Sequence, residues 1–164
     1  MAEIIYIPKK FIEKAREIGI DVETLIMNTL TEKLNINPNE EVNAHIELAN
    51  TFFKEGLQLI ERDPMQASEK FYKVAEECIK ALAISRNLEE ARESKINGRW
   101  TLKLLDMAAK KLSELINERI YDDWDHAYYL HIEGFHEARL TVEQVKARVR
   151  YIEELLKITE EALK

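Results

Sequence analysis

Residues 37–66 read NPNEEVNAHIELANTFFKEGLQLIERDPMQ, and this stretch decides the fold. It opens with Asn37 as an N-cap, Pro38 at the first helical position and Glu40 three residues after the cap, which together predict a helix start. Apolar residues then recur at helical spacing: Val42, Ile46, Ala49, Phe53, Gly56, Leu57 and Ile60. Asp63-Pro64-Met65-Gln66 repeats the start signal. Because only a few residues separate these two helices, they must fold back antiparallel.

The helical pattern continues towards the C-terminus. A second apolar stripe runs from Ala67 to Ser85, and a third follows from Trp100 to Leu115. Between them, residues 86–98 are polar and charged, so we expect the longest connection there, with at most a frayed helical turn. A histidine-rich helix is predicted at about 121–138, and the capping box that Thr141 begins starts the last helix. About five helices after residue 37 predict an all-α, up-and-down antiparallel bundle over residues 38–164.

The N-terminal residues 1–37 predict a small strand-helix-helix appendage. Residues 3–7 form a β-branched and aromatic run that Pro8 stops, which is typical of a short strand. One helix at 9–18 and another from Asp21 to about Asn35 follow. This order resembles a ribbon-helix-helix unit, whose strands pair across a dimer and read DNA. The strand has Glu3 as its only charge, so it can pair in a dimer but is poorly suited to reading DNA.

Composition narrows the class of protein. The chain has 164 residues, 34% of them charged, a net charge of −7 and only four Gly and three Pro, which fits long helices joined by short turns. The negative charge disfavours broad nucleic-acid binding. Cys78 is the one cysteine and lies in an apolar stripe, so we expect a buried thiol and a cytoplasmic protein. No apolar run approaches the ~20 residues that span a membrane, and no signal peptide is evident.

The segment WDHAYYLHIEGFHEA, residues 124–138, holds three of the four histidines. On an α-helix His131 shares one face with small and apolar residues, which indicates either a core histidine or an imidazole that lines a pocket and carries protons. The candidate ligand-binding residues are His131, Trp124, Tyr128, Phe135 and His136. Candidate partners of His131 are Glu76, Glu77 and Lys80, and Tyr72 and Trp100 are candidate walls.

Neither a metal site nor a cofactor is predicted. The three histidines are five residues apart, so on an α-helix they point in about three different directions, whereas two ligands on one helix need a spacing of three or four. Glu133 and His136 have that spacing, but the remaining histidine, His45, lacks a matching Glu three residues earlier. No phosphate loop, paired-cysteine motif or nucleophile elbow occurs, so a well-marked enzyme class is disfavoured.

Two stretches carry a family resemblance. EKFYKVAEECIKALA at 69–83, followed by Trp124-Asp-x-Ala-x-x-Leu-His131 and Gly134-Phe-His-Glu-Ala138, resembles the archaeal PaREP family over about residues 40–160. That family looks related to HEPN domains, which implies a helical bundle that often dimerises. Many HEPN domains are RNases of toxin–antitoxin and defence systems, and the active ones carry Arg and His separated by four to six residues. Arg119 and His126 have six residues between them, three of which are aspartates that would repel an RNA phosphate.

Three hypotheses about function follow. The first is an uncharacterised HEPN-like module that acts through protein association, in an archaeal defence or toxin–antitoxin context. We expect it to form a homodimer through the strand at 3–7, an apolar flank of residues 124–136, or both, and a further protein partner is compatible with this reading. The second is a metal-independent RNase that uses Arg119 and His126. The third is a small-ligand binder with a cleft at His131.

Overall fold

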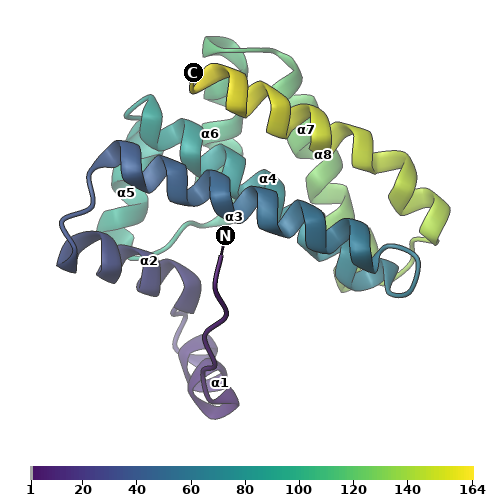
Figure 1. Cartoon of the computed structure of the whole chain (residues 1–164), viewed down its shortest axis with the longest axis horizontal. Helices are drawn as coiled ribbons and strands as arrows, with labels where there is room; N and C mark the ends of the chain where they lie inside the picture. The colour runs from purple at the N-terminus through teal and green to yellow at the C-terminus, as the bar shows by residue number, and fades with distance from the viewer. Residues whose placement is uncertain (1) are drawn as a thin grey trace.

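The computed structural model describes residues 2–164, and every regular element in that range is helical (Figure 1). The elements are α1 (Lys9–Glu17), α2 (Val22–Lys33), α3 (Pro38–Leu59), α4 (Pro64–Ser85), α5 (Glu89–Asn97), α6 (Leu102–Leu115), α7 (Arg119–Tyr129), the π-helix η1 (Leu130–His136) and α8 (Val142–Ala162). The prediction of an all-α fold is confirmed. The predicted count of five helices after residue 37 is too low, because six α-helices and η1 follow it. None of the described helices is long and apolar enough to cross a membrane.

Short polar motifs start the long helices where the sequence places them. The Asn37 side chain accepts from the backbone N–H of Glu40 at 3.0 Å, and the Glu40 carboxylate accepts from the backbone N–H of Asn37 at 3.0 Å. Asp63 caps α4 through the backbone N–H of Gln66, also at 3.0 Å. Thr141 forms the predicted capping box at the start of α8. Each cap satisfies backbone N–H groups that an isolated helix end would leave unpaired.

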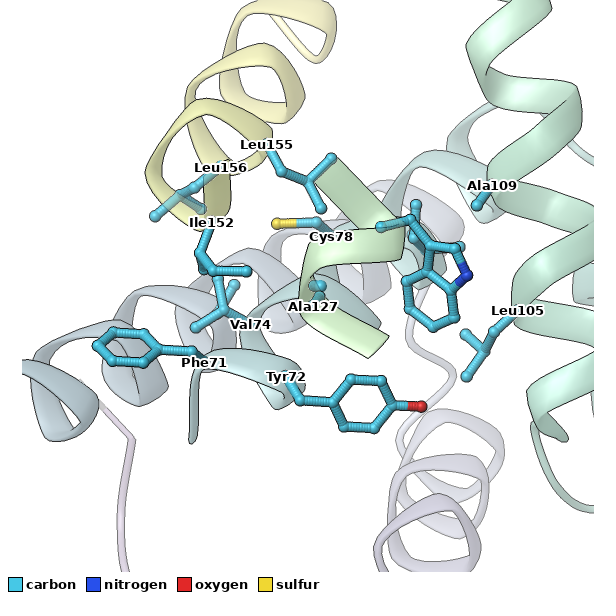
Figure 2. Close-up of a cluster of buried hydrophobic side chains, with 14 of the residues drawn as sticks. Phe71, Tyr72, Val74, Cys78, Leu105, Ala109, Ala127, Ile152, Leu155 and Leu156 are labelled. Carbon is cyan, nitrogen blue, oxygen red and sulfur yellow. The ribbon is translucent and has the colours of Figure 1, made fainter. Parts of the chain in front are cut away.

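Helix α4 is the centre of the bundle, because it packs against α3, α6, α7, η1 and α8. Its inward side chains are fully buried, and Figure 2 shows Phe71, Val74 and Cys78 among apolar side chains of other helices. Burial raises the pKa of the Cys78 thiol to about 12, which makes it the inert core residue that was predicted. At Gly56 of α3 a Cβ atom would lie 2.7 Å from the Phe71 ring, so this glycine permits α3 to approach α4 closely.

Residues 86–98 are not the long connection that the sequence predicts, because α5 forms within them. The sequence pattern did not predict this helix because its side chains are mostly polar, yet some of them are buried against α6. Glu90 is only 2% exposed and its carboxylate lies 2.5 Å from Lys111 Nζ of α6. α5 ends at Gly98, whose φ of +71° is the left-handed conformation that favours glycine. The helix therefore packs through a tertiary ion pair and through Leu88 and Ala91, without a long apolar stripe.

Residues 2–36, here called the arm, differ from the rest of the chain in packing loosely. No strand forms in the described part of the arm, because the extended residues 2–8 have no neighbouring strand to pair with. α1 has no buried residue and projects away from the bundle (Figure 1). Two polar contacts tie the arm to the body: Lys73 Nζ lies 2.8 Å from Glu23, and Arg99 Nη1 donates to the carbonyl oxygen of Gly19 at 3.2 Å.

Candidate functional site

The histidine-rich segment changes helix type half-way along. The sequence predicts one α-helix over 121–138, but α7 ends at Tyr129 and the chain continues as η1. The backbone N–H of Glu137 donates to the carbonyl oxygen of Ile132 at 2.9 Å, five residues back. A π-helix has wider turns than an α-helix, so residues five apart come to lie over one another. Turns of this kind occur frequently at functional sites.

Gly134 permits η1 to lie close against α4. A Cβ atom at this position would lie 2.5 Å from the Cβ atom of Ser68, so any side chain would force the two elements apart. Ser68 is fully buried, and its hydroxyl donates to the carbonyl oxygen of Pro64 at 2.7 Å. The residue after Ser68 is Glu69, and the close approach places its carboxylate beside the imidazole of His131.

His131 and His136 meet, contrary to the prediction that the histidines point in different directions. Their Nε2 atoms lie 3.1 Å apart, with the two rings nearly perpendicular at 80°. His131 Nδ1 lies 2.8 Å from Glu69 Oε2. Because a carboxylate only accepts hydrogen bonds, Nδ1 of His131 is the donor to Glu69, and in the neutral imidazole its Nε2 is then an acceptor. His136 then donates its Nε2–H, which completes a chain from Glu69 through His131 to the surface.

Aromatic rings hold His131 in place. Tyr72 stacks on the imidazole with ring centroids 4.0 Å apart and an angle of 23° between the planes. Phe135 and Tyr128 lie further out, at centroid distances of 6.3 and 6.4 Å. Burial, and then the nearby Glu76 carboxylate, raises the pKa of the Tyr72 hydroxyl well above its usual range. Tyr72 thus contacts His131 from the hydrophobic core, to which it belongs, whereas Trp100 packs at the edge of that core.

The predicted acid and base partners of His131 form a separate buried cluster. His45 Nδ1 of α3 lies 2.5 Å from Glu77 Oε2, and Lys80 Nζ lies 2.9 Å from the other oxygen of the same carboxylate. Burial alone would raise the pKa of Glu77, but Lys80 and His45 outweigh it and lower that pKa. Glu76 lies 3.7 Å from Lys80. Sequence reasoning missed both Glu69 and the role of His45, because the rotation of α4 decides which of its carboxylates faces which histidine.

Trp124 and Tyr128 line a surface cavity of about 350 Å³ together with Leu102, Lys103 and Asp106 of α6. The indole N–H of Trp124 donates to Asp106 Oδ1 at 3.1 Å. His131 is not among the described residues that line this cavity. The predicted ligand-binding set therefore divides in two. Trp124 and Tyr128 belong to the cavity, and His131, Phe135 and His136 form a ring cluster that Tyr128 adjoins.

Arg119 and His126 lie two turns apart on α7, and each contacts α8. The Arg119 guanidinium donates twice to the Glu154 carboxylate, with both N–O distances at 3.2 Å. The His126 ring stacks on Tyr151 with centroids 3.6 Å apart and planes 7° apart. Burial, and then the charge of Arg148, lowers the pKa of His126, which favours its neutral form. Both side chains of the predicted RNase pair thus have partners within the fold.

Asp123 is a fully buried carboxyl group next to this pair. Arg119 Nη2 lies 3.8 Å from its Oδ1 atom. Burial, followed by the charge of Glu154, raises the pKa of Asp123 to about 7, and the nearby Arg119 does not cancel this shift. A buried acid that titrates near neutral pH makes the α7–α8 contact sensitive to pH.

Comparison with known protein families gives a match within the bundle. The model of the archaeal PaREP1/PaREP8 family matches residues 44–156, which include α4, α7 and η1. The chain belongs to this family. The PaREP resemblance expected from residues 69–83 and 124–138 is thereby confirmed.

Two solved structures are similar to this PaREP1/PaREP8 member. A crystal structure of a Sulfolobus solfataricus protein is 35% identical, with a TM-score of 0.66 over 71% of this chain and 97% of that chain. A solution structure of the Orf c02003 protein, the same structural-genomics target, is 37% identical, with a TM-score of 0.62 over 71% of this chain and 91% of that one. None of the curated proteins matches the chain. The family match begins after the arm, so the arm lies outside the shared body.

Proposed function

We propose that this protein acts through association, and that the arm pairs with the arm of a second copy. The observation that carries the proposal is the exposure of large apolar side chains in the arm. Tyr6 is 92% exposed, Ile4 80% and Ile18 73%. Each such side chain contributes about 1.5–3 kcal/mol when it is fully buried. Neighbouring apolar side chains that stay exposed in this way usually mark a contact surface.

The extended part of the arm lacks the pairing that its backbone needs. Among the described residues, no backbone N–H or C=O group of residues 2–7 has a hydrogen-bond partner. An unpaired extended segment is a template for another strand. Pairing with the same segment of a second copy satisfies both segments at once, because twofold symmetry makes the contact reciprocal. Residues 1–36 carry five Lys or Arg and six Asp or Glu, so two arms can approach without strong repulsion.

The arm helices also leave room for a partner. A cavity of about 540 Å³ separates the arm from the turn at 97–99, and Ile18, Ile20 and Leu25 line its arm side. Phe11 and Leu34 are more than half exposed as well. The body of the same chain leaves these apolar side chains largely uncovered. A second arm offers the matching apolar surface, as in the predicted homodimer.

Light scattering on the full chain tests this proposal. We expect a dimer at micromolar concentration, and Ile4→Asp should shift it to monomer. Ile96→Asp is the matched control, since Ile96 is 84% exposed on α5, outside the arm, and should leave the dimer intact. A monomeric wild-type chain contradicts the proposal. A dimer that persists after Ile4→Asp and after removal of residues 1–36 places the interface on the bundle, including the flank at 124–136, and also contradicts it.

RNA cleavage by a HEPN-like body is the second candidate, as part of a defence or toxin–antitoxin system. It is favoured by the position of Arg119 and His126 on the same side of α7. For Arg119 to reach a phosphate, it must leave the carboxylate of Glu154. If the proposal holds, purified protein cleaves RNA and His126→Ala abolishes the cleavage. Equal activity of the variant and the wild type would assign any cleavage to a contaminant.

A further inference from the structure

We propose that His131 and His136 form a binding site for a divalent transition-metal ion that prefers imidazole, namely Zn²⁺, Ni²⁺ or Cu²⁺. Their Nε2 atoms are 3.1 Å apart. Two nitrogen ligands at about 2.0–2.1 Å from a tetrahedral zinc ion are roughly 3.3 Å apart, so the pair is within a few tenths of an ångström of that separation. The proposal is independent of self-association through the arm.

Glu69 supplies the second observation. A histidine that binds a metal almost always donates its other ring N–H to a carboxylate or carbonyl group, which fixes the tautomer and leaves the ligating nitrogen free. Glu69 does this for His131, with 2.8 Å between Oε2 and Nδ1. Tyr72 stacks on the same ring and fixes its plane. His131 is therefore oriented as a ligand before any ion arrives.

His136 provides the adaptable half of the site. It is exposed, so its ring can rotate and carry its proton on Nδ1 instead of Nε2, which leaves both Nε2 lone pairs free to face one ion. In an α-helix the two rings would diverge, and η1 is the element that aligns them. The site depends on a backbone feature as well as on the two side chains.

The ligand count decides what kind of site this is. Within residues 2–164, no group of three or more His, Cys, Asp or Glu side chains gathers in a way that could hold a metal. The ion would have two protein ligands, and water would fill its other positions. Such a site is exchangeable rather than structural, because structural zinc sites use four protein ligands. Hard ions such as Mg²⁺ prefer oxygen ligands, so we do not expect them to bind here.

Titration calorimetry on the full chain, free of any histidine tag, tests the proposal. ZnCl₂ and NiCl₂ are the probes, and MgCl₂ is the hard-ion control. We expect one Zn²⁺ or Ni²⁺ per chain, loss of binding in His136→Ala, and affinity lower by about 10- to 100-fold in Glu69→Gln. His126→Ala removes a neighbouring imidazole that stacks on Tyr151, and it should bind as the wild type does.

His136 is exposed, so its alanine variant should keep the helical circular-dichroism spectrum of the wild type. A wild-type chain that binds neither Zn²⁺ nor Ni²⁺ overturns the proposal. Binding that survives His136→Ala overturns it too, because the ion then sits elsewhere. Equal binding of Mg²⁺ would show a non-specific carboxylate site. Shifts of the His131 and His136 ring resonances on adding Zn²⁺, with the His126 ring unchanged, would support the site independently.

Discussion

The substitution Gly134→Ala tests whether the absence of a side chain at this position permits η1 to pack closely against α4. The added methyl group would lie 2.5 Å from the Ser68 Cβ atom, whereas carbon atoms in contact are about 3.5–4.0 Å apart, so the two elements must separate by about 1 Å. Overpacking of this kind costs about 1–3 kcal/mol. Because the Ser68 Cβ atom is attached to the backbone and cannot rotate away, we take about 3 kcal/mol. Alanine regains up to about 1 kcal/mol of helix propensity, which leaves a net loss of about 2 kcal/mol.

Urea unfolding followed by circular dichroism measures this loss, and the melting temperature should fall by about 4–8 °C for a chain of this size. Ser68→Gly removes the clashing atom and is the control. The double variant Gly134→Ala, Ser68→Gly should be more stable than the sum of the two single losses by about 3 kcal/mol, the whole cost of the clash. A Gly134→Ala variant as stable as the wild type, or losses that simply add, would refute the close approach.

Three further predictions concern buried groups. Lys80→Met should cost about 3–5 kcal/mol in urea unfolding, because it leaves Glu77 buried without its main cation. Phe71→Ala should cost about 3–5 kcal/mol, since its ring is fully buried in the core. The pKa of Asp123 is about 7 in the folded state and 3.8 otherwise, so the folded state binds the proton more tightly, and stability should fall as pH rises from about 4 to 7. Asp123→Asn should flatten this decline and raise the free energy of unfolding by about 1–2 kcal/mol at high pH. This is less than the ~4 kcal/mol that corresponds to the full pKa shift, because the variant also loses the attraction between Asp123 and Arg119. Urea unfolding of the wild type and of Asp123→Asn at about pH 5 and about pH 8 measures this decline. If the reasoning is wrong, the variant loses as much stability between the two pH values as the wild type does.

The parts of the fold that local chemistry controls could be predicted from the sequence. Asn37, Asp63 and Thr141 cap helices through backbone groups two or three residues away, so their effect is visible in a short window. α5 was missed because its stabilising contact, Glu90 with Lys111, joins two helices and leaves no apolar stripe. The strand at 3–7 was predicted from composition, but a strand also needs a partner, which a single chain does not provide here.

The candidate site was located by its composition, but its geometry could not be predicted. The segment around His131 was identified, and Tyr72 was expected beside it. The assumption of 100° per residue then separated His131 from His136, because it does not hold in η1, whose Gly134 packs against Ser68, far away in the chain. The periodicity of an α-helix fails where the number of residues per turn changes, as it does in η1.

The π-helix also determines how this segment would respond to a change in length. Deletion of one residue from 132–133 would shorten η1 to a length that an ordinary α-helix accommodates. The two imidazoles would then be four residues apart and would again share one face. Relatives with a one-residue gap here could therefore keep the same pair on a shorter backbone. In an alignment of such relatives, the gap belongs between the histidines, and forcing it outside them would separate residues that occupy the same place in space.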